Sequence, residues 1–197
     1  MSSLPKTLEK IIHSLSSLPG IGKKTAQRLG MYMIKMDHDF ILDFANALID
    51  MKNNIFSCPI CNNFCESTSC NICSNTMRNS DMICIVENPS DIILFENTGF
   101  KGTFHVLGGL LSPLDGISPE DLSIDQLLNR LDNVKEIILA IGTSVEGETT
   151  SLYLINLLKK YNIKISRLSQ GLPVGGHLEY IDEATLEKSF TERVEIN

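Results

Sequence analysis

The sequence predicts a multi-domain α/β protein, and three observations support this fold class. Apolar residues recur at helical spacing over residues 4–51, five of the six cysteines lie between Cys58 and Cys73, and short apolar runs alternate with helical patterns after Asp81. Alternating strands and helices are typical of a mostly parallel sheet covered by helices. With 197 residues, 43% of them hydrophobic, the chain is long enough to bury such a core.

The same patterns divide the chain into units. A small helical unit is expected at residues 1–53, with helices over residues 4–18, 23–36 and 40–51. The cysteine-rich unit covers residues 54–77. An α/β unit follows at residues 78–170, with strands expected at 82–86, 104–107, 136–141 and 163–168 and helices near 90–97, 119–131 and 148–161. The last unit, residues 171–197, is glycine-rich and then acidic.

Charge is distributed unevenly along the chain. The net charge of −7 argues against nucleic-acid binding by the chain as a whole, because contact with a phosphate backbone depends on concentrated Lys and Arg. Residues 1–36, however, carry six basic side chains and one acidic one, a local charge of +5, whereas residues 81–197 carry nine basic and eighteen acidic ones, a local charge of −9. The first unit is therefore the one suited to approach DNA.

The cellular compartment affects whether closely spaced cysteines form disulfides or bind a metal. There is no basic start followed by an apolar segment and no apolar run of bilayer length, so we expect a cytoplasmic protein that is not held in a membrane. In a reducing cytosol, closely spaced cysteines are more often metal ligands or redox groups than disulfides. The cysteine cluster is therefore interpreted first as a metal site.

Cys58-x-x-Cys61 and Cys70-x-x-Cys73 form two knuckles, each able to present two thiolates to one tetrahedral ion. Four cysteines with no spare ligand position describe a closed structural site for one Zn²⁺ per chain. An iron–sulfur cluster uses the same ligands, but usually at other spacings. Because so short and polar a segment cannot build a core, the metal is expected to supply its folding free energy.

Two further cysteines are not expected to be ligands. Cys65 lies between the knuckles and is interpreted as a free side chain in the loop, in preference to exchange with a ligand, since four other sulfurs already close the site. Cys84 begins an apolar strand and is interpreted as a small buried hydrophobe.

The stretch LPGIGKKTAQRL lies between the first two predicted helices. Gly20 and Gly22 permit a tight hairpin whose backbone amides face outward at the start of the next helix, where the helix dipole favours a phosphate. Lys24 and Arg28 are four residues apart and share one face of that helix, with Lys23 beside them. This resembles a helix-hairpin-helix motif, which contacts phosphates without reading sequence. The alternative is a glycine-capped turn with solvated lysines; the local charge favours DNA.

Three glutamates follow strands of the predicted sheet. Glu87 comes directly after the strand MICIV, and Glu146 and Glu148 lie in the loop after EIILAI. The carboxyl ends of parallel strands share one edge of a sheet, where such carboxylates would suit Mg²⁺, which prefers oxygen ligands and phosphate partners. The alternative is that they are solvated loop residues, or that Glu148 favours the start of the following helix through its dipole.

Taken in order, these features resemble one protein family. The glycine hairpin and the cysteine knuckles are followed by ICIVENPSD, HVLGGLLSPLDGISPEDL, TSVEGETT and GLPVGGHLEYID. The ordered set closely resembles the RecR family of bacterial recombination mediators and covers almost the whole chain. The resemblance implies that residues 78–170 form a Toprim domain and that residues 171–197 form a Walker-B-like C-terminal segment.

The resemblance also implies a role in DNA recombination and in the repair of DNA damage. Family members act in the RecFOR pathway, where they work with RecO and RecF to help RecA load onto single-stranded DNA covered by single-strand-binding protein, and they are not known as enzymes. They assemble as dimers and as ring-like tetramers wide enough to surround DNA. A zinc knuckle would hold the DNA-binding helices of such a clamp at a fixed angle to its assembly domain.

Residue by residue, Lys24 and Arg28 match the family's DNA-contacting positions, the four knuckle cysteines match its zinc ligands, and Glu87 matches the Toprim glutamate. Glu146-x-Glu148 replaces the aspartate pair of Toprim enzymes, which argues against catalysis. Three departures accompany these matches: Lys23 stands where proline is common, AIGTS replaces a loop containing Asn-Pro, and Leu110 stands where a polar residue is frequent.

The sequence therefore predicts a non-enzymatic, DNA-binding clamp and adaptor. One alternative is a Mg²⁺-dependent nuclease, nicking enzyme or primase that uses the three glutamates. Another is a protein-interaction module whose basic helix is merely solvated. Against the nuclease interpretation, no histidine has a visible nucleophilic partner. An ATPase is not expected, because the chain lacks a G-x-x-x-x-G-K-[S/T] loop.

Overall fold

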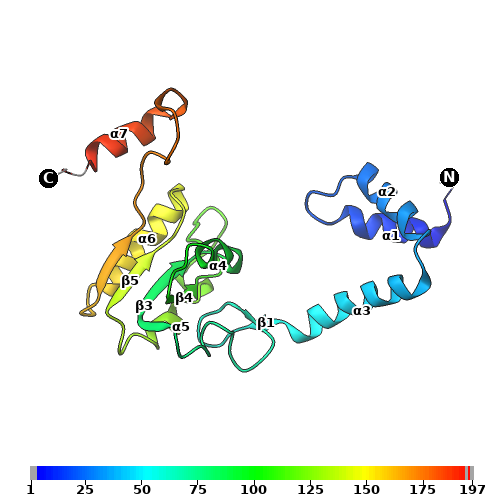
Figure 1. The fold of residues 1–197 in the computed structure, drawn as a ribbon, viewed down its shortest axis with the longest axis horizontal. Helices are drawn as coiled ribbons and strands as arrows, with labels where there is room; N and C mark the ends of the chain where they lie inside the picture. The colour runs from blue at the N-terminus through cyan, green and yellow to red at the C-terminus, as the bar shows by residue number, and fades with distance from the viewer. Residues whose placement is uncertain (1–3, 194, 196–197) are drawn as a thin grey trace. The chain divides into compact units, whose positions relative to one another are not determined.

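The computed structural model describes residues 4–193 and 195, and Figure 1 labels the elements. The chain separates into two compact units, residues 1–55 and residues 56–197. Within the described part of the chain, no helix combines the length and the apolar character needed to cross a membrane.

The first unit consists of α1 (Lys6–Ser16), α2 (Lys23–Met33) and α3 (His38–Asn54). The first two helices pack closely because Gly30 has no side chain. A Cβ atom at Gly30 would lie 3.0 Å from Cγ1 of Ile12 and 3.3 Å from Cδ1 of Leu8. A methyl group here would therefore require the Ile12 or Leu8 side chain to move by a few tenths of an ångström.

Helix α3 differs from the other two because none of its residues is buried. Its apolar side chains are nevertheless numerous, and the largest exposed ones are Phe40, Leu42, Phe44, Leu48, Ile49 and Met51. Residues of all three helices line an apolar groove of about 650 Å³. The first unit therefore presents an apolar surface that its own core does not cover.

The second unit begins with the cysteine-rich segment, in which β1 (Phe56–Ser57) and β2 (Phe64–Cys65) form a short antiparallel pair. A four-stranded sheet follows, in the order β4-β3-β5-β6, and every pairing in it is parallel. Its strands are β3 (Asn79–Val86), β4 (Gly102–Val106), β5 (Glu136–Leu139) and β6 (Lys164–Arg167). The predicted α/β class with a parallel sheet is confirmed.

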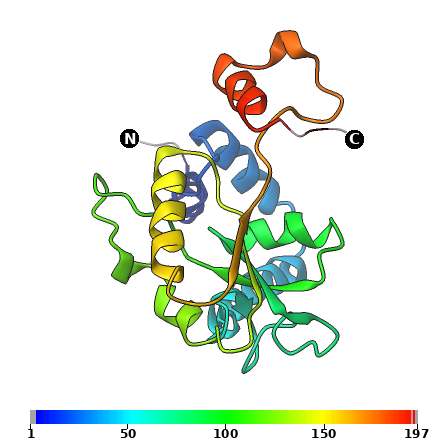
Figure 2. The same cartoon turned by 90° about the vertical axis from the view of Figure 1, so that its left-hand side faces the viewer.

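Both faces of the sheet are covered, and the alternation of side chains along β3 shows how. Ile83 and Ile85 join a core with α5 (Ile124–Leu128) and α6 (Val145–Leu158), whereas Cys84 and Val86 join a second core with α4 (Pro89–Glu96). Figure 2 shows α6, in yellow, and α4, in green, on opposite sides of the strands. A strand buried on both faces needs a continuous apolar run, which MICIV provides.

Two predicted helices differ from the observed ones. The helix expected near 119–131 is instead a 3₁₀ turn, η1 (Pro119–Asp121), followed by the short α5, because the backbone of Leu122 between them is extended. The helix expected near 148–161 begins earlier, at Val145, because the Ser144 side chain accepts a hydrogen bond from the Gly147 amide at 3.1 Å. Glu146 and Glu148 therefore lie in the first turn of α6 and not in a loop.

The C-terminal segment contains two elements that the sequence analysis did not identify, η2 (Leu178–Tyr180) and α7 (Glu183–Thr191). Asp182 is the N-cap of α7, and its side chain accepts a hydrogen bond from the backbone N–H of Thr185 at 2.9 Å. An aspartate at this position is a standard start signal and was visible in the sequence.

Candidate metal centre and nucleic-acid interface

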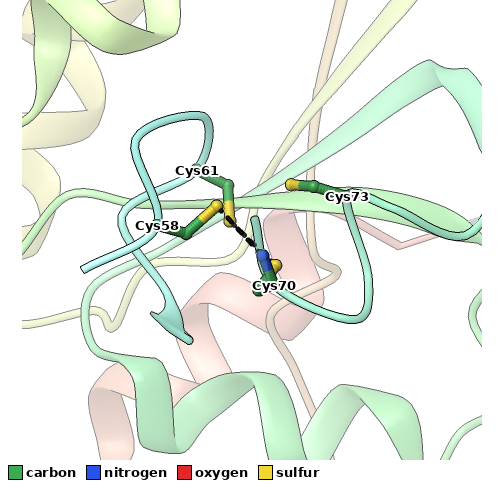
Figure 3. Close-up of side chains that lie close together, drawn as sticks. All are labelled: Cys58, Cys61, Cys70 and Cys73. Carbon is green, nitrogen blue, oxygen red and sulfur yellow. Dashed lines mark hydrogen bonds between the residues drawn. The ribbon is translucent and has the colours of Figure 1, made fainter. Parts of the chain in front are cut away.

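The four knuckle cysteines meet at one point in the second unit (Figure 3). Their sulfur atoms all lie within 4.8 Å of one another, and the Sγ atoms of Cys61 and Cys70 are 3.5 Å apart. Four thiolates at about 2.3 Å from a tetrahedral zinc are separated by about 3.8 Å, so the spacing suits one ion. The cluster can therefore hold a metal with sulfur ligands alone.

Local backbone geometry builds the first knuckle. The backbone N–H of Cys58 donates to the Asn63 carbonyl at 2.6 Å, and the N–H of Asn62 donates to the Cys58 carbonyl at 2.9 Å. Asn62 has a φ of 61°, a left-handed conformation that asparagine tolerates better than most residues. This tight turn brings Cys58 and Cys61 to the same side of the loop.

The environment of the sulfurs favours a bound cation. Burial raises the pKa of the Cys58 thiol, but hydrogen bonds from the backbone of Cys70, Ile60 and Cys61 outweigh it and hold that pKa at about 7. The Cys70 N–H lies 3.4 Å from the Cys58 sulfur. A hydrogen bond with Cys73, together with burial, raises the pKa of Cys61. Thiolates packed this closely repel one another, and a divalent ion removes that cost.

The knuckles are attached to the sheet by hydrogen bonds far apart in sequence. The N–H of Val106, at the end of β4, donates to the Cys61 carbonyl at 2.9 Å, and the Asn62 side-chain amide donates to the Val106 carbonyl at 3.2 Å. Ile72, between the last two cysteines, packs against both the cysteine cluster and the core under α4. The metal site is therefore joined to the α/β domain as a structural element.

The remaining two cysteines lie outside this group of four. Cys65 lies in strand β2 and not in a loop as expected, and it is buried in the same cluster as Cys58, Cys61 and Cys70. Burial, followed by the charge of Cys58, raises its pKa. Cys84 is buried within the sheet, where burial raises the pKa of its thiol to about 12. A thiol held in its neutral form is a poor nucleophile, as expected of a residue that only fills space.

The glycine hairpin precedes α2, as predicted from the sequence. Gly20 has a φ of 79°, and the Ile21 N–H donates to the Leu18 carbonyl at 3.1 Å, which closes the turn. Gly22 is the N-cap of α2 and has no side chain to cover the amides of the first turn. The side chains of Lys23, Lys24 and Arg28 are exposed. Backbone amides and basic side chains thus lie together at the start of one helix, an arrangement suited to phosphate groups.

The three glutamates lie at the edge of the sheet but do not assemble as a metal site. Among the described residues, the cysteine cluster is the one group of three or more His, Cys, Asp or Glu side chains able to share an ion. Glu87 follows β3, and Glu146 and Glu148 follow the adjacent strand β5 in the first turn of α6. Adjacent parallel strands bring these residues to the same edge without directing their oxygens to one point.

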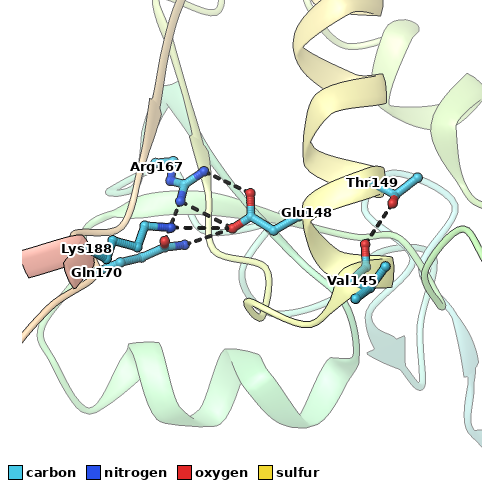
Figure 4. A network of polar contacts seen from close by, with 6 residues as sticks. All are labelled: Val145, Glu148, Thr149, Arg167, Gln170 and Lys188. Atoms are coloured by element: carbon cyan, nitrogen blue, oxygen red, sulfur yellow. Dashed lines mark hydrogen bonds and ion pairs between the residues drawn. The ribbon is translucent and has the colours of Figure 1, made fainter. Parts of the chain in front are cut away.

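Glu148 is instead bound by side chains of its own chain (Figure 4). Arg167, the last residue of β6, forms two contacts of 3.2 Å with its carboxylate, and Gln170 donates to it at 3.3 Å. Lys188 of α7 lies 3.8 Å from the same carboxylate. The Gln170 hydrogen bond and the positive charge of Arg167 hold the pKa of Glu148 below its usual value. Sequence reasoning missed all three partners, which carry no motif.

Close packing at Gly147 positions these acidic residues. A Cβ atom at Gly147 would lie 2.0 Å from the Gly142 carbonyl oxygen, so only glycine allows the first turn of α6 to sit against the loop that follows β5. The VEGE stretch is therefore constrained by backbone contact as well as by its charges.

Three family models match the chain. The model for the RecR helix-hairpin-helix matches residues 8–52, that for the Toprim domain residues 81–169, and that for the RecR C-terminal region residues 171–194. Among curated proteins, the chain is similar to "Recombination protein RecR" of Parabacteroides distasonis, with 44% identity over 193 residues, which cover 96% of this chain and 93% of the relative.

The fold and the site together define a Toprim-domain protein that also carries a helix-hairpin-helix unit and a four-cysteine metal site. Identity that extends over nearly the full length of a curated relative is more specific than a shared domain. The chain belongs to the RecR family, and it is accordingly a protein of recombinational repair.

Proposed function

We propose that this chain is a non-enzymatic DNA clamp and adaptor of the RecFOR pathway. In this role it binds DNA without sequence preference and works with RecO, and with RecF, in the cytoplasm to promote RecA loading onto DNA covered by single-strand-binding protein. The observation that carries the proposal is the start of α2, where Lys24 and Arg28 are exposed beside the amides of the Gly20–Gly22 hairpin. Phosphate contacts of this kind position a protein on DNA without reading bases.

DNA binding is tested by its dependence on salt. Lys24→Ala and Arg28→Ala are each expected to weaken binding to a labelled gapped duplex, with the log-log salt slope falling by about one per lost phosphate contact. Lys101→Ala removes an exposed charge from the acidic domain and is the matched control, with no expected change. An unchanged slope in the Lys24→Ala/Arg28→Ala double variant would refute the DNA contact.

Zinc is the metal that we propose for the cysteine cluster, with Cys58, Cys61, Cys70 and Cys73 as its ligands. Its support is the all-sulfur donor set, whose four sulfur atoms lie within 4.8 Å of one another. When bound, zinc contributes charge neutralisation and a rigid cross-link rather than chemistry, because four protein ligands leave no open position. The residues around it then hold residues 54–77 against the end of β4.

Assembly into dimers and ring-like tetramers is the second part of the proposal. Its support is the uncovered apolar surface of α3 and the adjoining groove of about 650 Å³. An apolar surface of this extent is typical of a protein–protein interface and is unusual on a small unit that remains in contact with water. Leu48→Glu, within the groove, is expected to lower the oligomeric state in light scattering at equal protein concentration. A mass unchanged by this substitution would argue against assembly through this surface.

The acidic sheet edge is proposed as the contact for RecO. Glu146 is only half-buried in the first turn of α6, so a basic surface can reach it. Glu146→Lys is expected to weaken RecO association without a change in folding, and normal association would refute this assignment. The absence of catalysis is tested on the same gapped DNA, because cleavage that requires Mg²⁺ and disappears in Glu87→Gln would instead establish a nuclease.

A further inference from the structure

Helix α2 presents a second feature beside its lysines and arginine. Six residues line a shallow concavity of about 510 Å³ along one side of the helix, and these are Lys24, Gln27, Arg28, Met31, Tyr32 and Lys35. At 3.6 residues per turn the five of them within α2 fall within about 140° of arc, and Lys35 follows in the turn after the helix ends. The opposite side of α2 holds the buried Ala26 and Gly30, and Gly30 lies against α1. The concavity is therefore the outward face of the unit.

Tyr32 is the distinctive member of this outward face. Its side chain is 59% exposed, and it lies one turn after Arg28 and three residues before Lys35. Met31, beside it, is 39% exposed. Residues 1–36 carry a net charge of +5, so the exposed aromatic ring lies within the most basic part of the chain. An aromatic side chain among cations is the arrangement by which proteins bind unpaired bases and their phosphates together.

We infer that this face binds single-stranded DNA, with an unpaired base stacked on Tyr32 and with Lys24, Arg28 and Lys35 on the phosphates. The inference rests on the proposed function and extends it from DNA in general to a preferred form of DNA. In a duplex the faces of the bases are stacked on one another, so Tyr32 has no ring to contact there. Phosphate contacts alone do not select for unpaired bases, whereas the aromatic ring adds affinity only where bases are unpaired.

The test measures the affinity of the full-length chain for three probes of equal length by fluorescence anisotropy. The probes are an oligothymidine strand, the same backbone with abasic sites, and a blunt duplex. Tyr32→Ala is expected to weaken binding to oligothymidine about tenfold, while the affinity for the duplex and for the abasic strand stays within twofold. Tyr32→Phe keeps the ring and should bind oligothymidine as the unaltered chain does. The salt slope should be unchanged in both variants, because no phosphate contact is lost.

Tyr180→Ala is the matched control, since Tyr180 is an exposed tyrosine of the C-terminal segment. Circular dichroism melting of each variant establishes that it is folded. The inference would be overturned if Tyr32→Ala did not lower the affinity for oligothymidine. It would also be overturned if the variant lost the same affinity for all three probes, because Tyr32 would then act through the structure of α2. If Lys24→Ala and Arg28→Ala leave binding to every probe unchanged, the proposed function itself fails, and that result is separate from any effect of Tyr32.

Discussion

The cysteine cluster and the acidic sheet edge both consist of potential metal ligands, but only the cysteines bring their ligand atoms close enough together to share an ion. Four sulfurs converge within 4.8 Å, whereas the three glutamates do not form a group able to share an ion. Glu148 is bound by Arg167, Gln170 and Lys188. A glutamate at the edge of a Toprim sheet can thus be paired with cations of its own chain, whereas closely packed thiols without such partners favour a bound ion.

The two regions also differ in what holds them together. The cysteine segment has a small core made of the cysteines themselves, with Ile72 packed against it. The sheet whose edge carries the glutamates has apolar cores on both faces. Removal of metal should therefore affect the first region, and changes in packing or in buried charge should affect the second.

Metal removal is expected to have the largest effect. A chelator, or Cys61→Ser, should unfold residues 58–73, because metal binding supplies on the order of 10 kcal/mol to small zinc modules. Hydrogen exchange should rise in this segment but not in β3 or β5. Elemental analysis should find one zinc per chain, retained in Cys65→Ser as the control. Iron, or no metal in the purified protein, would contradict the zinc assignment.

Acid is expected to have the next largest effect, through His105 in β4. Its Nε2–H donates to the Ser123 carbonyl at 2.7 Å, and its Nδ1 has no partner in the described part of the chain. Burial lowers its pKa from 6.5 to about 4. His105 therefore takes up a proton at a higher pH in the unfolded chain than in the folded chain. Its contribution to the free energy of unfolding is complete above about pH 6.5 and falls by about 3 kcal/mol as the pH drops to 4.

Urea unfolding of the sheet between pH 7 and pH 4 measures this dependence. His105→Gln should show a flatter pH profile, whereas His38→Gln, at an exposed position, should match the unaltered chain. Parallel profiles for all three proteins would show that His105 does not titrate as its burial requires.

The third largest effect is expected from disturbing the close backbone contact between Gly147 and Gly142 at the acidic edge of the sheet. Gly147→Ala should lower the free energy of unfolding by about 1–3 kcal/mol, because the new methyl group collides with the Gly142 carbonyl and displaces the first turn of α6. Gly142→Ala is the matched control, since a Cβ atom there meets no other atom within 4 Å. Equal melting temperatures for both variants would show that α6 is not held at this contact.

The smallest effect is expected at the ion pair between α7 and α6. Lys188→Gln should cost about 0.5 kcal/mol or less, since the pair is partly exposed. The pKa of Glu148 should rise towards its usual value, as measured by NMR titration, because one neighbouring positive charge is gone. Calorimetric titration with Mg²⁺ extends the test: Mg²⁺ binding by Lys188→Gln but not by the unaltered chain would show that the cations mask a metal site.

Features that depend on neighbours along the chain could be predicted from the amino-acid sequence alone. The two C-x-x-C knuckles needed only a tight turn each, and the hairpin at Gly20 needed a residue that accepts a positive φ. The run MICIV could be identified as a buried strand because a strand covered on both faces has no polar side. Composition and spacing were sufficient in each case, since the relevant contacts are local or repeat along one element.

Contacts between side chains far apart in the sequence could not be predicted, because they depend on how the elements pack. Arg167 and Lys188 reach Glu148 from β6 and α7, and no spacing rule connects these positions. Helix α5 is short because Leu122 is extended, and α3 leaves its apolar residues exposed, which the predicted helix at residues 40–51 did not indicate. Such outcomes depend on how elements pack, because a carboxylate takes whichever cation the fold brings to it, and the sequence order does not state which that will be.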